Sequence, residues 1–133
     1  MLKNIQRKIK GVIAYDFDGV IATYNRPFRY NVLGKPNYDV IRSIRYFYKQ
    51  GYYILIFTGR LKTRKMQVWL KKYKVPYNGF NKNPLPIPLV DNFKPYYNVI
   101  IEDKAVYYHY LNKKKSTKQL IKEIKKRLKE SNE

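Results

Sequence analysis

The fold is decided by residues 11–20, which read GVIAYDFDGV. The run from Val12 to Tyr15 is continuously apolar, which is typical of a parallel strand buried on both faces. Asp16 and Asp18 follow at a spacing of two residues, so on a strand they point to the same side. The stretch therefore predicts a buried strand that ends in a pair of like charges, with Gly19 letting the chain turn away.

The paired carboxylates need a positive partner, because close like charges repel and burial strengthens the repulsion. Carboxylate oxygens are hard ligands that suit Mg²⁺, so a metal ion at Asp16 and Asp18 is one interpretation. The alternative is a strand that runs into an Asp-rich turn, since Asp and Gly are common turn residues.

Further motifs favour the first interpretation. Three of them follow in chain order: FTGR at 57–60, Lys94, and IEDK at 101–104. With DFDGV at 16–20, they resemble the four motifs of the haloacid dehalogenase (HAD) superfamily of phosphotransferases, over about residues 11–109. Lys94 is the weakest match, and Lys82 is the fallback for its role. The Thr58-Gly59-Arg60 segment also resembles the corresponding motif of polynucleotide-end phosphatases in that superfamily.

The same residues predict the fold class. Strands alternate with helices along the chain, which implies a parallel sheet with right-handed crossovers. The resemblance implies an α/β protein with the three-layer α/β/α Rossmann-like fold of the superfamily. Residues 20–35 are too few for a folded cap domain. We expect residues 1–112 to form the phosphatase core and residues 113–133 a basic C-terminal helix of the same domain.

Apolar spacing places the elements between the motifs. A helix is expected from Asn37 as N-cap to a stop at Gly51, followed by a strand over 52–57. Its apolar face is predicted from Val40, Ile41, Ile44, Phe47 and Tyr48. A second helix is expected over 63–72, with Trp69 in its buried stripe, and strands over 75–80 and 98–101. In the C-terminal helix, Ser116 and Gln119 fit a capping box. The apolar face of that helix is predicted from Leu120, Ile121, Ile124 and Leu128.

The resemblance implies a role for each motif residue. Asp16 would be the nucleophile and Asp18 the general acid and base. Thr58 and Lys94 would bind and stabilise the phosphoryl group, while Gly59 and Arg60 would contact substrate. Mg²⁺ would be the cofactor, and its expected ligands are the Asp16 carboxylate, the Asp18 main-chain carbonyl, Asp103 and, second-shell or alternative, Glu102. All these residues follow predicted strands, where open α/β sheets place their ligands.

Composition bounds the partners. The 133 residues contain no cysteine, which excludes disulfides and thiolate metal sites. No apolar run is long enough to span a membrane and no signal peptide is evident, so a cytoplasmic protein is expected. Lys and Arg number 29 against 9 Asp and Glu, a formal net charge of +20. Such a charge attracts polyanions, although compositional bias of the coding sequence is an equal alternative.

Together these features predict a Mg²⁺-dependent phosphomonoester hydrolase that forms an aspartyl-phosphate. Its phosphorylated substrate is expected to be a nucleotide or a nucleic-acid end, because a capless site is open and the surface is basic. Two alternatives stay open: a small-metabolite phosphatase, and a non-catalytic HAD scaffold that binds nucleic acid. The oligomeric state does not follow from the sequence.

Overall fold

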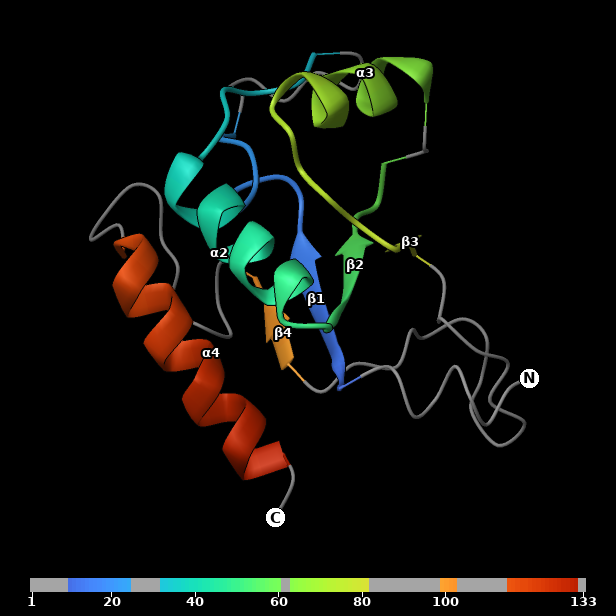
Figure 1. The fold of residues 1–133 in the computed structure, drawn as a ribbon. Helices are drawn as coiled ribbons and strands as arrows, with labels where there is room; N and C mark the ends of the chain where they lie inside the picture. The colour runs from blue at the N-terminus through green and yellow to red at the C-terminus, as the bar shows by residue number, and fades with distance from the viewer. Residues whose placement is uncertain (1–9, 25–31, 61–62, 82–98, 103–114, 132–133) are drawn as a thin grey trace, which may run out of the picture.

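The computed structural model describes residues 10–24, 32–60, 63–81, 99–102 and 115–131. Within them the strands are β1 (Val12–Asp16), β2 (Tyr53–Phe57), β3 (Gly79–Phe80) and β4 (Val99–Ile101), all parallel. The helices there are α2 (Tyr38–Lys49), α3 (Arg64–Lys72) and α4 (Thr117–Ser131) (Figure 1). The predicted α/β class with a parallel central sheet flanked by helices is confirmed.

The strand order is β3-β2-β1-β4. The chain therefore builds the sheet from β1 through β2 to β3, and then adds β4 on the other side of β1. In open parallel sheets such a reversal leaves a crevice at the carboxyl ends of the two strands that flank it. Here those strands are β1, which ends at Asp16, and β4, which is followed by Glu102.

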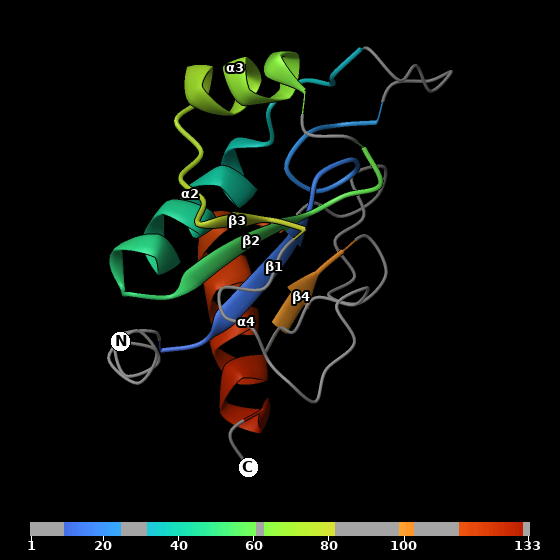
Figure 2. The same ribbon diagram turned by 90° about the vertical axis from the view of Figure 1, so that its right-hand side faces the viewer.

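Alternate residues of the strands enter two apolar clusters. In the larger cluster, Tyr15, Ile54 and Ile101 pack with buried side chains of α2, α3 and α4. Figures 1 and 2 show these helices on the same face of the sheet. A smaller cluster of Val12, Ala14 and Leu55 projects from the opposite face. Because both faces carry buried apolar residues, the sheet is consistent with a three-layer Rossmann-like fold.

The helix α2 shows where the predicted apolar face was right and where it was wrong. Its residues Val40, Ile41, Ile44 and Phe47 are buried, and Gly51 ends the helix at φ +93°, as expected. Tyr48 was assigned to the same face, but its side chain is 43% exposed. Tyr48 lies in the last turn of α2, where its side chain borders a groove that is also lined by Leu70, Val75 and Pro76.

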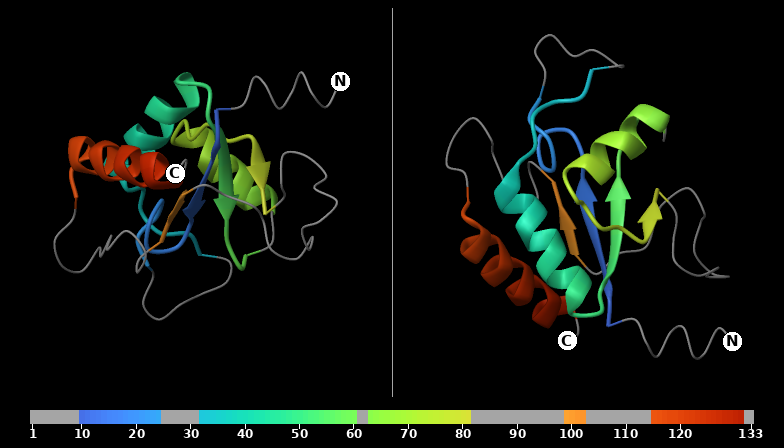
Figure 3. Two further views of the ribbon diagram at one scale, coloured as in Figure 1. Left: turned by 90° about the horizontal axis from the view of Figure 1, so that it is seen from below. Right: turned by 45° about the horizontal axis from the view of Figure 1, so that its top comes forward.

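The helix α4 packs along α2, as Figure 3 shows from two directions. Its predicted capping box is present: Ser116 N donates to Gln119 Oε1 at 2.9 Å, and Gln119 N donates to Ser116 Oγ at 3.2 Å. Its predicted apolar face is confirmed by three buried residues, Leu120, Ile124 and Leu128, and one partly buried residue, Ile121. Among the described residues, no helix combines the length and the apolar character needed to span a bilayer.

No cap domain forms within the described residues between β1 and α2. Residues 21–24 instead pair with residues 34–37, with Ala22 and Pro36 forming an antiparallel bridge. Thr23 N donates to Lys35 O at 2.9 Å, and Asn37 N donates to Ile21 O at 2.8 Å. We call these two short segments the hairpin base. These two described segments form no folded lid over the carboxyl ends of the strands.

Candidate active site

The end of β1 brings two of the predicted motifs to one edge of the sheet. Asp16 pairs in register with Phe57 of β2, so Thr58 lies immediately beyond it on the neighbouring strand. On the other side, Tyr15 pairs with Ile101 of β4, which places Glu102 beside Asp16. Asp16, Thr58 and Glu102 thus come from three adjacent strands at the point where the strand order reverses.

A tight loop after β1 presents the two aspartates. Ile21 N donates to Asp16 O at 3.3 Å, Ala22 N to Phe17 O at 3.0 Å, and Gly19 N to Ala22 O at 2.8 Å. Gly19 adopts φ +84°, and a Cβ there would lie 2.5 Å from the ring of Tyr24. Only glycine meets both conditions. Phe17 points into the core, and the half-buried Asp16 and Asp18 flank it.

Asp18 forms a bidentate ion pair with Arg60. Arg60 Nε donates to Asp18 Oδ2 at 2.8 Å and Arg60 Nη2 donates to Asp18 Oδ1 at 3.0 Å. The side chain of Asp18 is only 15% exposed and that of Arg60 only 4%. Arg60 Nη2 also donates to Val32 O at 3.2 Å, next to the hairpin base. The sequence predicted a positive partner for the paired carboxylates. At Asp18 this partner is the guanidinium of Arg60, which follows β2.

Thr58 is held by a residue that the sequence reasoning missed. Thr58 N donates to Asn81 Oδ1 at 2.9 Å, and Asn81 Nδ2 donates to Thr58 O at 2.8 Å. Asn81 follows β3 in a left-handed conformation, φ +54°, which asparagine tolerates better than most residues. Its amide thus continues the ladder of β2 where β3 has ended. The sequence signal was an asparagine directly after the strand predicted over residues 75–80.

The Thr58 hydroxyl has a local role as well. Thr58 is 7% exposed, and its Oγ1 accepts a hydrogen bond from Arg60 N at 3.1 Å. This bond bends the chain over Gly59, which is exposed. A Cβ added at Gly59 would meet no atom within 4 Å, so the space beside this main chain is open to a ligand. The substrate contacts predicted for Gly59 and Arg60 stay a prediction; Gly59 is exposed, whereas Arg60 is buried.

Trp69 supports the site from behind. Its ring meets Phe17 edge-on, with centroids 5.0 Å apart, and its Nε1 donates to Gly34 O at 3.0 Å. At Gly34 a Cβ would lie 1.9 Å from Thr23 O, so the hairpin base closes only around glycine. The prediction that Trp69 is a core residue is confirmed, since it is 9% exposed and lies in the larger cluster. It fixes the loop that carries Asp18 against α3.

Tyr15 anchors the strand that carries Asp16. Its hydroxyl lies 3.2 Å from Ser43 Oγ, which itself donates to Val40 O at 2.6 Å, so Tyr15 is the donor. Burial raises the pKa of Tyr15 far above its ordinary value, and the hydrogen bond with Ser43 offsets only part of this rise. Tyr15 therefore stays neutral, and its hydrogen bond with Ser43 connects β1 to α2.

The predicted metal ligands are only partly within the described residues. Asp16, Asp18 and Glu102 offer oxygen atoms, which are the donors Mg²⁺ prefers. In the part of the chain that the structure describes, no three acidic, His or Cys side chains group closely enough to hold a metal ion. Asp103, the expected third carboxylate, lies outside that part, as do Lys94 and Lys82. The oxygen donors among these residues suit Mg²⁺, and the Asp18 carboxylate is engaged by Arg60.

Comparisons with known proteins bear on the fold. No protein-family model matches the sequence, and no curated protein matches it either. A conserved protein from Bacteroides thetaiotaomicron has a similar structure, with a TM-score of 0.65 and 17% identity, covering 87% of this chain and 90% of that one. A Vibrio cholerae crystal structure aligns over 90% of this chain and 97% of its own, with 22% identity and a TM-score of 0.47. The likeness to the Bacteroides thetaiotaomicron protein supports the α/β fold.

Proposed function

We propose that the chain is a Mg²⁺-dependent phosphomonoester hydrolase of the haloacid dehalogenase type. The observation that carries the proposal is the meeting of Asp16, Asp18 and Thr58 at the carboxyl ends of β1 and β2, beside the strand-order reversal. Open α/β sheets bind ligands at that place. The sequence motifs and the position of the residues therefore support the same function independently.

In the proposed reaction an Asp16 carboxylate oxygen attacks the phosphorus atom and forms a phosphoaspartyl bond. The bond to the leaving oxygen breaks, and that oxygen takes its proton from Asp18. Water then attacks the phosphoaspartyl group while Asp18 accepts a proton, which releases phosphate and restores Asp16. Bound Mg²⁺ would neutralise charge between nucleophile and phosphate.

The ion pair between Asp18 and Arg60 is compatible with these reaction steps if substrate binding weakens the pair. In the structure both carboxylate oxygens of Asp18 accept hydrogen bonds from Arg60, whereas the proposed first step needs one of them to face the leaving oxygen. A phosphate group is itself a good partner for a guanidinium, and it would compete with Asp18 for Arg60. Arg60 would then contact substrate, and Asp18 would be free to carry a proton.

The same ion pair also favours a second candidate function, a non-catalytic scaffold that binds nucleic acid. A carboxylate that is already held by two hydrogen bonds from arginine can serve structure alone. In that case Asp16 would have no nucleophilic role, and the formal charge of +20 would account for binding.

Turnover of p-nitrophenyl phosphate, with and without Mg²⁺, separates the two candidates. The proposal predicts metal-dependent turnover that Asp16→Asn removes, since the amide is nearly isosteric but a far poorer nucleophile. A protein that binds oligonucleotides but releases no phosphate under either condition would instead be the scaffold.

A further inference from the structure

A groove between α2 and α3 gathers positive charge around an apolar floor. Its volume is about 540 Å³. The floor is formed by Leu70, Val75 and Pro76, and its walls carry Arg45, Tyr48, Lys49, Lys71 and Lys74. Among the residues that the structure describes, none that lines the groove carries a carboxylate. Among the described residues, no acidic side chain forms an ion pair with these cations.

Part of this charge has a local explanation. Arg45 Nε donates to Lys74 O at 3.0 Å, and Arg45 Nη2 donates to Tyr73 O at 2.8 Å, so Arg45 caps the end of α3. Lys49 and Lys71 lie in the last turns of their helices, where cations offset the helix dipole. Lys74 is different: it adopts φ +53°, a conformation that favours Gly or Asn, so the backbone gives no reason for lysine.

Tyr48 adds a second kind of contact. Its side chain is 43% exposed, unlike the buried apolar residues of α2, and it borders the groove. An exposed aromatic ring among cations is the combination that proteins use to bind single-stranded nucleic acid, since bases stack on the ring while phosphates meet the cations. A second basic groove, on α4, is lined by Glu123 and four other residues, none of them aromatic.

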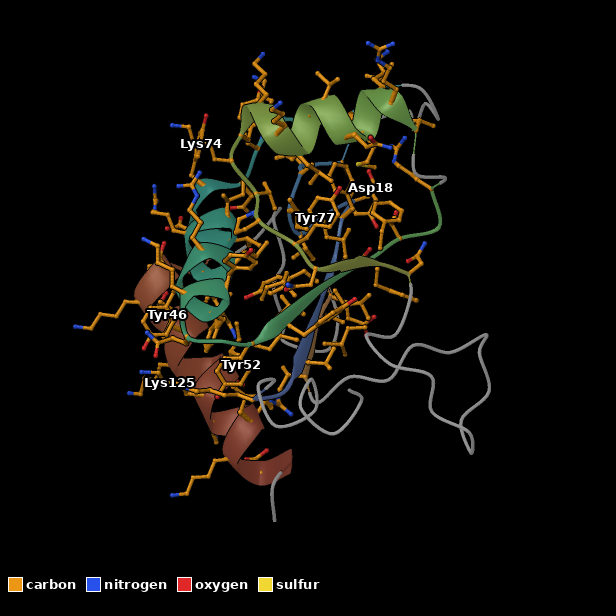
Figure 4. All side chains as sticks on the ribbon, turned by 45° about the vertical axis from the view of Figure 1, so that its right-hand side comes forward. Asp18, Tyr46, Tyr52, Lys74, Tyr77 and Lys125 are labelled. Carbon is orange, nitrogen blue, oxygen red and sulfur yellow. The ribbon has the colours of Figure 1, made fainter. Side chains whose placement is uncertain are left out.

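The groove and the candidate active site lie toward opposite ends of α3. Arg60 precedes the N-terminal end of α3, and Lys71 and Lys74 lie at its other end. Figure 4 shows Asp18 and Lys74 toward opposite ends of this helix. The nine residues of α3 span about 13 Å, a distance that a single strand of a few nucleotides can bridge.

We propose that the groove between α2 and α3 binds single-stranded nucleic acid and directs its phosphorylated end to Asp16. This inference rests on the proposed function for the role of the bound strand, whereas the binding itself is measured separately. It assigns the substrate class to single-stranded ends and places recognition on Tyr48, Lys49, Lys71 and Lys74.

The test compares two variants that each lose three positive charges. The groove variant is Lys49→Gln/Lys71→Gln/Lys74→Gln, and the control variant is Lys118→Gln/Lys122→Gln/Lys126→Gln on the exposed side of α4. Binding of a fluorescent single strand of about eight nucleotides with a terminal phosphate is measured by anisotropy across salt concentrations. The groove variant should reduce the slope of log K against log salt by about 2, and the control variant should change it much less.

Tyr48→Ala should weaken binding of the same strand roughly 5- to 150-fold without changing the salt slope. Turnover adds a second readout: the ratio of kcat/KM on the phosphorylated strand to that on p-nitrophenyl phosphate should fall in the groove variant and hold in the control variant.

Equal losses of binding in the two charge variants would overturn the inference, as would full binding by Tyr48→Ala. If wild type binds through the groove but hydrolyses neither substrate, the proposed function fails while the binding site stands. If wild type hydrolyses p-nitrophenyl phosphate and the groove variant binds the strand as wild type does, the binding site fails while the proposed function stands.

Discussion

Asp18 and Asp39 are both aspartates paired with an arginine, yet the two pairs hold different parts of the molecule. Asp18 meets Arg60 through two short hydrogen bonds with side chains 15% and 4% exposed. Asp39 meets Arg42 through one contact of 3.2 Å with side chains 37% and 53% exposed. Burial separates the two pairs, because water and salt screen the second but hardly reach the first.

The second pair serves helix docking. Asp39 Oδ1 accepts hydrogen bonds from Thr117 N at 3.0 Å and from Thr117 Oγ1 at 2.8 Å, so an acidic residue of α2 caps the first turn of α4. Arg42 contributes at the rim of this contact. The contrast teaches that the same residue types fix the loop after β1 at one end of the sheet and fasten a surface helix on its face.

The largest effect is expected within the candidate active site. Lys94→Ala should lower kcat/KM on p-nitrophenyl phosphate by a factor on the order of 10² to 10³, because one charge-stabilising contact in such a site is worth about 3–4 kcal/mol. Lys82→Ala, which removes the same charge in the same segment, should lower it much less. Steady-state kinetics measures both, and the reverse ranking would move the role to Lys82.

The two ion pairs can be broken by the same substitution. Arg60→Met should destabilise the protein by about 3 kcal/mol, because it leaves the mostly buried carboxylate of Asp18 without its partner. Arg42→Met should cost less than about 1 kcal/mol, as exposed ion pairs do. Urea unfolding gives both free energies. Similar losses for the two variants would show that burial does not distinguish the pairs.

Asn78 and Asn81 both bind main-chain groups of β2 or its ends, Asn78 far from the candidate active site and Asn81 within it. Asn78 Oδ1 accepts from Ile54 N at 2.8 Å at the start of β2, and Asn81 holds both main-chain groups of Thr58 at its end. Asn81→Gly removes the side chain while suiting the left-handed backbone. It should lower kcat/KM about tenfold, mostly through kcat, since the phosphate contacts lose alignment.

Asn78→Ala is the matched control. It should cost about 1 kcal/mol of unfolding free energy through its lost hydrogen bond, with kcat/KM close to wild type. Asn81 is a positioning residue only if its substitution changes catalysis more than that of Asn78 does. Equal kinetic effects of the two variants would reduce Asn81 to a structural role.

The smallest effect concerns pH at the Asp39 contact. Burial opposes ionisation of Asp39, but hydrogen bonds from Thr117 and Arg42 outweigh it and lower the pKa of this carboxyl below its ordinary value. The contact therefore stabilises the fold fully above pH about 4 and loses this stabilisation as pH falls through the lowered pKa.

Asp39→Asn should remove this pH dependence at a cost of a few tenths of a kcal/mol near neutral pH, because solvent screens the carboxyl. The difference in urea midpoint between wild type and variant, followed from neutral pH to pH about 3, measures it. A difference that grows as the solution becomes more acidic would have the wrong sign for this mechanism.

The sequence predicted the elements whose signal is local. The run Val12–Tyr15, the capping box of Ser116 and the buried Trp69 depend on neighbours within a few residues, and the structure has all three. The apolar face of α2 was predicted correctly except at Tyr48, whose surroundings depend on how α3 and the segment after it, with Val75 and Pro76, pass it. Spacing along a helix contains no information about that distant segment.

The contacts of the candidate active site were harder to predict. The resemblance predicts a substrate contact for Arg60 but does not predict its ion pair with Asp18, 42 residues away in sequence. Asn81 reaches Thr58 across 23 residues because β3 ends after Phe80, and no motif marks that ending. Motif spacing gives the order of the groups along the chain, whereas their pairing is a property of the folded sheet.

The proposed nucleophile can be tested by trapping the phosphoenzyme. Wild type and Asp16→Asn are mixed with ³²P-labelled phosphomonoester and Mg²⁺, quenched in acid, and treated with hydroxylamine, which cleaves acyl phosphates. Wild type should retain label that hydroxylamine releases, and Asp16→Asn should retain none. Turnover by wild type without labelled protein, or equal labelling of the two proteins, would contradict catalysis through Asp16.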